Sequence, residues 1–192
     1  MRSNVEVVGH PLHPIIVTIA IGAFVSAFIF DIAALATGAP TWFEMSFWTL
    51  LIGVCAGVLS ALTGLFDYLT LRMSAGARKQ ATIHLVLNVT LMTLFIISVA
   101  LKGAYAAGGP QYPPSGRIVS TFILDLIGVG LLLVSGWFGG EVVYRHGVAV
   151  LEDAAPELGS ARQMGTTPIT GTLGGERPGQ EPPQDEEFEE GD

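Results

Sequence analysis

The four histidines are the residues of this chain best suited to chemistry, and two of them stand at the start of its first apolar segment. The stretch GHPLHPIIVTIAIGAF places His10 and His13, each followed by proline, directly before an unbroken apolar run. A neutral imidazole can ligate haem iron, zinc or copper without bringing a charge into an apolar environment. We therefore predict a cofactor site in which His13 and His84 are the first candidate ligands and His10 and His146 compete with them.

Other polar residues near the histidines are candidates for orienting them. They are Asp67, Asn88, Glu141 and Arg145. A metal-ligating histidine usually donates its second ring N–H to a carboxylate, a carbonyl or water, so such neighbours fix the ring in place. His84 and Asn88 are four residues apart and share one face of a helix. Glu141 and Arg145 have the same spacing, which is also typical of a simple local ion pair.

A purely structural interpretation of these residues stays open. Pro14 suits the first turn of a helix, so His10 and His13 can serve as interfacial caps or form interhelical hydrogen bonds. A structural hydrogen bond explains His84 as well as ligation does. Asp67 can form an ion pair with Arg72 or with a histidine.

The elements that must position these side chains are membrane-spanning helices. Half of the 192 residues are hydrophobic, only 14% are charged, and the mean hydropathy is +0.55. Segments at about 14–37, 46–70, 80–102 and 118–144 each reach the roughly 20 apolar residues that a helix needs to cross a bilayer. The first of them is too long for a cleavable signal peptide. We expect an all-α, four-transmembrane-helix bundle within residues 1–150.

The loops predict how this bundle is oriented. One side of the membrane receives five cations and the other receives two: Arg2, Arg72, Arg78, Lys79 and Arg145 against Lys102 and Arg117. The side with more Lys and Arg is the cytoplasmic one, so both termini are predicted to be cytoplasmic, together with all four histidines. Residues 151–192 hold eleven acidic and two basic residues and are predicted to form a disordered acidic tail.

Small residues mark the faces on which the helices pack. Membrane helices approach each other through Gly, Ala and Ser, often at alternating steps of three and four. Three such seams are His13–Ala20–Ala27–Asp31, Gly53–Gly57–Ser60–Gly64–Asp67 and Asp125–Gly128–Leu132–Ser135–Gly139–His146. They predict that Asp67 faces the interior, and that Asp31 and Asp125 pair with Lys102 or Arg117.

The sequence also contains a faint internal repeat. His84 follows His13 by 71 residues, and Ser135-Gly136-x-Phe138 follows Thr63-Gly64-x-Phe66 by 72. Two copies of a helical hairpin, related by an axis along the membrane normal, would place His13 and His84 at equal depth.

At this point the motifs resemble a known family. GHPLHP, TGLFDYL, ATIHLVLN and GWFGGEVVYRHG are similar to segments of the bacterial membrane proteins catalogued as domain of unknown function 2231 (DUF2231), over roughly residues 7–150. The resemblance implies a four-helix domain of the bacterial inner membrane without an established activity. Some relatives are joined to iron–sulfur or cytochrome-type domains, which implies electron transfer, although no such domain is recognisable here. The resemblance implies that the following residues of this chain occupy the motif positions of the family: His10, His13, Asp67, His84, Asn88, Glu141, Arg145 and His146.

These observations lead to one functional hypothesis and two alternatives. The hypothesis is an integral membrane protein that binds haem b, or a transition metal, and exchanges electrons with a redox protein partner. The first alternative is a non-catalytic scaffold or partner subunit whose polar cluster is structural. The second is a small transporter, which would need to form a homodimer because four unbroken helices leave little room for an alternating-access site.

Several function classes are not favoured. The body of the chain has no basic patch, so we expect no nucleic-acid binding. It has no Gly-rich phosphate loop and no nucleophile elbow, so an enzyme is less expected than a binding protein. Cys55 is the only cysteine and cannot form an internal disulfide.

Overall fold

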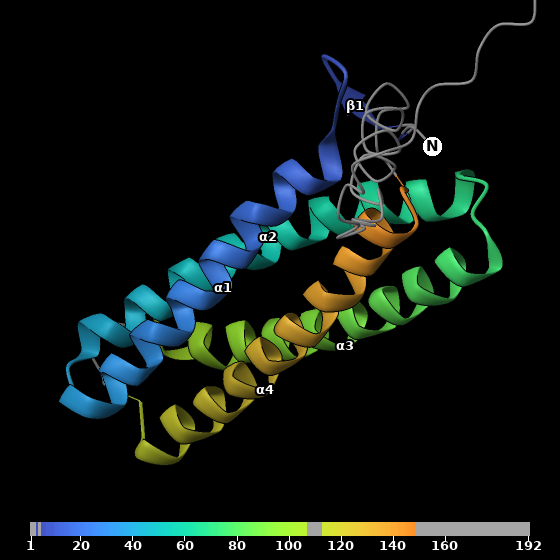
Figure 1. The fold of residues 1–192 in the computed structure, drawn as a ribbon. Coiled ribbons are helices and arrows are strands. Elements are labelled where there is room, and N and C mark those ends of the chain that lie inside the picture. The colour runs from blue at the N-terminus through green and yellow to red at the C-terminus, as the bar shows by residue number, and fades with distance from the viewer. Residues whose placement is uncertain (1–2, 4, 107–112, 149–192) are drawn as a thin grey trace, which may run out of the picture. The chain divides into compact units, whose positions relative to one another are not determined.

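The computed structural model describes residues 3, 5–106 and 113–148, and its main elements are long apolar helices (Figure 1). They are α1 (Leu12–Thr37), α2 (Pro40–Thr70), α3 (Ala75–Ala106) and α4 (Ser115–Gly140), followed by the short π-helix η1 (Glu141–Arg145). Each of α1 to α4 is long and apolar enough to cross a membrane. The all-α bundle is thereby confirmed. The acidic tail predicted for residues 151–192 lies outside the described residues.

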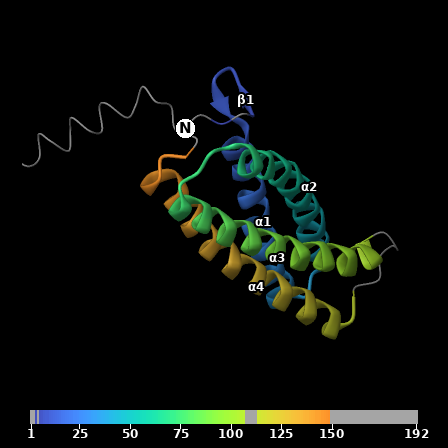
Figure 2. The ribbon, with the colours of Figure 1, turned by 90° about the vertical axis from the view of Figure 1, so that its right-hand side faces the viewer.

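The helices form two antiparallel hairpins, α1–α2 and α3–α4, which pack against each other (Figures 1 and 2). Helices α1 and α3 therefore run in the same direction. We call the end of the bundle at which α1 and α3 begin the histidine end, because it carries His13 and His84. The opposite end, which carries Lys102, is the lysine end. The predicted orientation of these ends relative to the cytoplasm stays a prediction.

The helices extend beyond the predicted spans. Gly38 adopts a left-handed conformation (φ 67°) that ends α1, and α2 begins immediately afterwards with Pro40 in its first turn. The segment TWFE, expected in a loop, is therefore helical. Helix α3 begins at Ala75 and continues to Ala106, so Lys102 lies within a helix and is fully buried. Lys102 was therefore wrongly counted among the loop cations. The hydropathy pattern ends with the apolar part of the helix, whereas the helix itself continues through the polar residues that follow.

A small hairpin precedes α1. Strand β1 (Glu6–Val7) pairs antiparallel with β2 (His10–Pro11), and the turn between them places Val8 at φ 51° and Gly9 at φ 78°. Two consecutive positive φ values are typical of a type I′ turn, which suits a two-residue hairpin. The sequence did not predict this hairpin, which fixes the chain immediately before the first membrane helix.

The core lies on the predicted seams. Phe24 of α1 stacks on Phe95 of α3, with ring centroids 4.2 Å apart, at the centre of the bundle. Glycines of the neighbouring helices make room for these rings, since a Cβ on Gly53 would lie 2.7 Å from Phe24 and one on Gly128 would lie 2.5 Å from Phe95. The seam residues Ala20, Ala27, Gly53, Gly57, Ser60, Asp67, Gly128, Leu132 and Ser135 are buried as predicted.

The two hairpins repeat the same contacts. Residues of α1 and α3 correspond at a spacing of 71, which relates His13 to His84 and Phe24 to Phe95. Residues of α2 and α4 correspond at a spacing of 75, which relates Gly53 to Gly128. The repeat therefore has a structural counterpart, but the predicted spacing of 72 for its second half is wrong. The connections between the paired helices differ in length, so one spacing cannot describe both halves.

Candidate functional site

His13 is anchored to the neighbouring helix of its own hairpin. Its Nδ1 lies 2.8 Å from the backbone carbonyl oxygen of Ser60 and 3.1 Å from the Ser60 hydroxyl. A carbonyl oxygen can only accept, so in the neutral ring the proton lies on Nδ1 and Nε2 carries a lone pair. The interhelical hydrogen bond allowed by the sequence is thus the contact observed, and His13 belongs to the first turn of α1 rather than to its cap.

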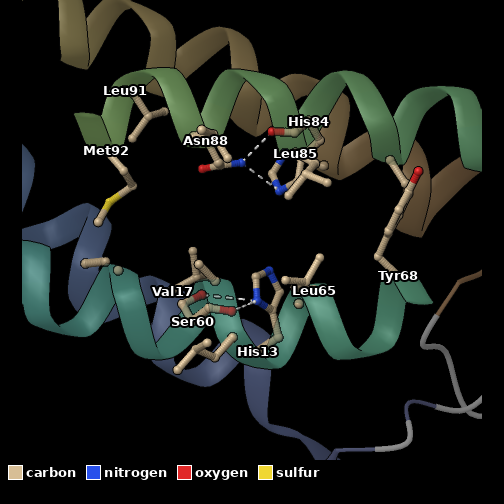
Figure 3. A pocket seen from close by; sticks show the side chains of 18 of the residues that line it. His13, Val17, Ser60, Leu65, Tyr68, His84, Leu85, Asn88, Leu91 and Met92 are labelled. Carbon is tan, nitrogen blue, oxygen red and sulfur yellow. Dashed lines mark hydrogen bonds between the residues drawn. The ribbon is translucent and has the colours of Figure 1, made fainter. Parts of the chain in front are cut away.

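His84 has the same anchor in the second hairpin. Its Nδ1 lies 2.8 Å from the carbonyl oxygen of Ser135 and 3.1 Å from the Ser135 hydroxyl. The two imidazoles project toward each other from opposite sides of one pocket (Figure 3). The structure therefore presents two Nε2 lone pairs, one from each hairpin, to a shared space.

Asn88 holds His84 from the same helix, as the sequence predicted. Its Nδ2 lies 2.8 Å from the carbonyl oxygen of His84, 2.8 Å from the hydroxyl of Ser135 and 3.1 Å from Nε2 of His84. An amide nitrogen has only two N–H groups, and Nε2 is the most distant of the three acceptors. The two shorter bonds can use both donors, which leaves the Nε2 lone pair available.

Each imidazole packs on a glycine. A Cβ on Gly64 would lie 2.8 Å from the ring of His13, and one on Gly139 would lie 2.9 Å from the ring of His84. Even alanine at either position would meet the ring at less than van der Waals distance. Glycine at these places lets each histidine lie flat against the neighbouring helix.

The pocket between the imidazoles is large and mainly apolar. It has a volume of about 500 Å³ and lies between the two hairpins at the histidine end. Its polar lining comes from a small set of side chains, namely His13, Ser60, Asp67, Tyr68, His84, Asn88 and Thr93. A concave apolar site with a few convergent polar groups is typical of ligand and cofactor pockets.

Part of the pocket lining is exposed on α2 and α3. Leu62 of α2 and Val89 and Ile96 of α3 line the pocket although these residues are 61%, 60% and 47% exposed. Exposed apolar side chains on a membrane-spanning helix face lipid. These residues therefore lie at the boundary between the pocket and the bilayer interior.

His10 and His146 lie away from the pocket. His10 is exposed in the N-terminal hairpin, where its Nδ1 lies 3.0 Å from the carbonyl oxygen of Val8. His146 follows η1 and packs near Gly76 at the start of α3. The prediction that His146 continues the seam of α4 assumes α-helical spacing. The chain instead forms a wider π-helical turn at Glu141–Arg145, which changes the direction in which His146 points.

The remaining candidate residues have mixed placements. Asp67 lines the pocket and accepts a hydrogen bond of 2.6 Å from Ser3, whereas Arg72 is exposed. Glu141 and Arg145 form the expected local ion pair at 3.0 Å, outside the pocket lining. The structure thus brings His13, Asp67, His84 and Asn88 to one pocket.

Sequence reasoning missed the two serines that anchor the histidines. Ser60 and Ser135 were recognised only as small seam residues, although their carbonyl and hydroxyl oxygens receive the imidazoles. The sequence contains a signal that could have identified these serines: Ser60 is followed by Gly64 four residues later, and Ser135 is followed by Gly139 at the same spacing.

The fold and the pocket together define a multi-pass integral membrane protein with an intramembrane cavity and lipid-facing helices. The chain belongs to the DUF2231 family, described as predicted membrane proteins, whose model matches residues 9–152. This match confirms the resemblance noted in the sequence. Comparison with curated proteins and with solved structures gave no match.

Proposed function

We propose that the protein binds a b-type haem in this pocket, where His13 and His84 would hold the iron, and that the haem would transfer electrons to a redox partner in the bacterial inner membrane. One observation carries the proposal: both imidazoles are fixed through Nδ1 to a backbone carbonyl, and both Nε2 atoms face one apolar pocket. Histidines that ligate metals are typically held in this way.

The number of available ligands favours haem over a bare metal ion. The described residues contain no group of three or more His, Cys, Asp or Glu side chains arranged to hold a metal ion. Zinc and copper sites generally need three or four protein ligands, whereas a porphyrin supplies four nitrogens itself. Two histidines suffice for a six-coordinate haem iron.

The surroundings of the pocket suit such a group. The walls that α2 and α3 contribute are mainly apolar, as the faces of a porphyrin are, and a volume of about 500 Å³ lies within the usual range of cofactor pockets. Tyr68 lines the same pocket, and the guanidinium of Arg78 stacks on its ring at 5.1 Å. Arg78 is thus a cation positioned beside the pocket, where it can pair with a propionate.

Absorption spectroscopy tests the proposal. Full-length protein expressed with a haem supply and purified in detergent should show a Soret band whose reduced spectrum is that of a six-coordinate, low-spin haem. His13→Ala and His84→Ala should each abolish that spectrum. His10→Ala and His146→Ala are matched controls, because these histidines lie outside the pocket, and they should leave the spectrum unchanged. A colourless protein that takes up no added haem would refute the proposal and favour the scaffold alternative.

A second candidate ligand is a lipid-soluble quinone. The exposed pocket-lining residues of α2 and α3 favour it, because a molecule dissolved in the bilayer can reach them, and the hydroxyl of the reduced quinol can donate a hydrogen bond to the Nε2 lone pair of His13 or His84. Organic extraction of the purified protein followed by mass spectrometry distinguishes the two ligands. Quinone in stoichiometric amount, lost in His13→Phe and His84→Phe, would support this second candidate.

A further inference from the structure

The lysine end contains a buried ionic cluster to which each of the four membrane helices contributes one residue. Nζ of Lys102 on α3 lies 2.7 and 2.8 Å from the two carboxylate oxygens of Asp31 on α1, 2.6 Å from the hydroxyl of Ser46 on α2, and 2.7 Å from Oδ2 of Asp125 on α4. All four residues are at most 2% exposed. The predicted pairing of Asp31 and Asp125 with a basic residue is confirmed, and Lys102 serves both.

The contacts of Lys102 match those of an ammonium group. An ammonium group has three N–H donors and no acceptor. One donor serves the two oxygens of Asp31, and the others serve Ser46 and Asp125. The ring of Phe43, 6.0 Å from Nζ, adds a favourable cation–π contact. A neutral amine has only two N–H donors and could make all three contacts only if the Ser46 hydroxyl donated to its lone pair.

The cluster contains one more negative charge than positive charge if both aspartates are ionised. The other charged residues near this end do not correct the imbalance: Arg117 of α4 stacks on Tyr105 with 5.5 Å to the ring centroid, and Glu44 of α2 is exposed. The side chains of the two ion pairs have at most 3% of their surface accessible. An uncompensated charge sealed inside a membrane protein is strongly unfavourable, so one more positive charge is required.

The two aspartates differ in how their oxygens are satisfied. Both oxygens of Asp31 contact the ammonium, whereas Oδ1 of Asp125 is buried without a hydrogen-bond partner among the described residues. Oxygens of both carboxyl groups lie within 2.8 Å of the same Nζ, so the two groups are immediate neighbours, and two ionised carboxylates in such a position repel each other. A proton on Asp125 makes it a donor and removes the excess charge.

We propose that Asp125 is an intramembrane proton-binding site, which holds a proton at neutral pH and donates it in a hydrogen bond to ionised Asp31. Lys102 fixes the position of both carboxyl groups, and Ser46 occupies its third donor. The cluster is then electrically neutral. The site lies at the end of the bundle opposite to the histidine pocket and does not depend on what that pocket binds.

Infrared spectroscopy of the full-length protein in liposomes tests this proposal. With carboxyl-¹³C-labelled aspartate, the wild-type protein at neutral pH should show the carbonyl stretch of an un-ionised carboxylic acid, shifted by the label. The band should disappear in Asp125→Asn and persist in Asp67→Asn, which removes another buried aspartate. If the wild-type protein showed no label-sensitive band, the proposal would be overturned without any variant. Persistence of the band in a folded Asp125→Asn protein would also overturn it.

An alkali cation could supply the same charge, so the spectrum is recorded in sodium, potassium and choline buffers. A bound proton predicts the same band in all three. A band that appears only in choline would show that a metal cation occupies the cluster and would overturn the assignment. The melting temperatures give a second, independent measurement: Asp125→Asn keeps a contact to Lys102 and should melt near the wild-type temperature, whereas Asp31→Asn should melt well below it. Equal losses in the two variants would contradict the proposed difference between the aspartates.

Discussion

Replacing Gly139 by alanine tests the anchoring of His84 directly. The new Cβ would lie 2.9 Å from Cε1 and 3.1 Å from Nδ1 of the imidazole, which is about 0.6 Å short of an ordinary contact of about 3.5 Å. The ring is held by the carbonyl and hydroxyl oxygens of Ser135 and cannot move without losing these contacts. We therefore expect the ring to be displaced from the carbonyl of Ser135.

The size of the effect follows from three contributions. Overpacking costs about 1–3 kcal/mol, and a lost interhelical hydrogen bond costs about 0.6 kcal/mol on average in a membrane protein. Alanine is favoured over glycine in a helix by about 1 kcal/mol, which partly offsets the loss. Gly136→Ala is the matched control, because a Cβ there meets nothing within 4 Å. Since both variants gain the same helix propensity, Gly139→Ala should be about 2–4 kcal/mol less stable than Gly136→Ala.

The assay is reversible unfolding in mixed micelles of detergent and dodecyl sulfate, followed by circular dichroism. A second readout is the imidazole ¹⁵N spectrum, in which His84 should change from a hydrogen-bonded Nδ1–H tautomer to a mixture. Equal stability of the two variants, together with an unchanged His84 signal, would refute the packing argument. Gly64→Ala should behave like Gly139→Ala and perturb His13 instead.

Two further predictions concern the ends of the bundle. Arg145→Ala should change the free energy of unfolding by no more than about 0.5 kcal/mol, because its ion pair with Glu141 is a local pair whose arginine side chain is 71% exposed; a larger loss in the same micelle assay would show that η1 has a further role. A fluorescent protein fused after residue 150 should fluoresce in bacterial cells, and alkaline phosphatase fused there should be inactive. The reverse result would place the histidine end outside the cytoplasm.

Much of the fold and part of the site could be predicted because membrane helices obey simple rules. Hydrophobic length defined the spans, and the spacing of small residues placed Ser60, Asp67 and Asp125 on buried faces. The same reasoning correctly put His84 and Asn88 on one face. These features depend only on helical periodicity, which is a local property of the sequence.

The failures have a common physical origin in non-local or irregular geometry. The spacing rule assumed an unbroken α-helix, so the π-helical turn after Gly140 displaced His146 from the predicted seam. The count of loop cations included Lys102, the last residue of the predicted span 80–102, because a lysine that pairs with residues of other helices cannot be recognised from its own segment. The hydrogen bonds from the histidines to Ser60 and Ser135 use main-chain oxygens, which no side-chain pattern reveals.

The correspondence between the hairpins reaches the lysine end, where it relates Asp31 to Lys102. Two residues of opposite charge therefore occupy equivalent places and bind each other across the bundle. A bundle built from two copies of the first hairpin would bring two aspartates together, and one built from two copies of the second would oppose two lysines. The opposite charges therefore favour a bundle in which a first hairpin packs against a second hairpin over a bundle made of two like hairpins.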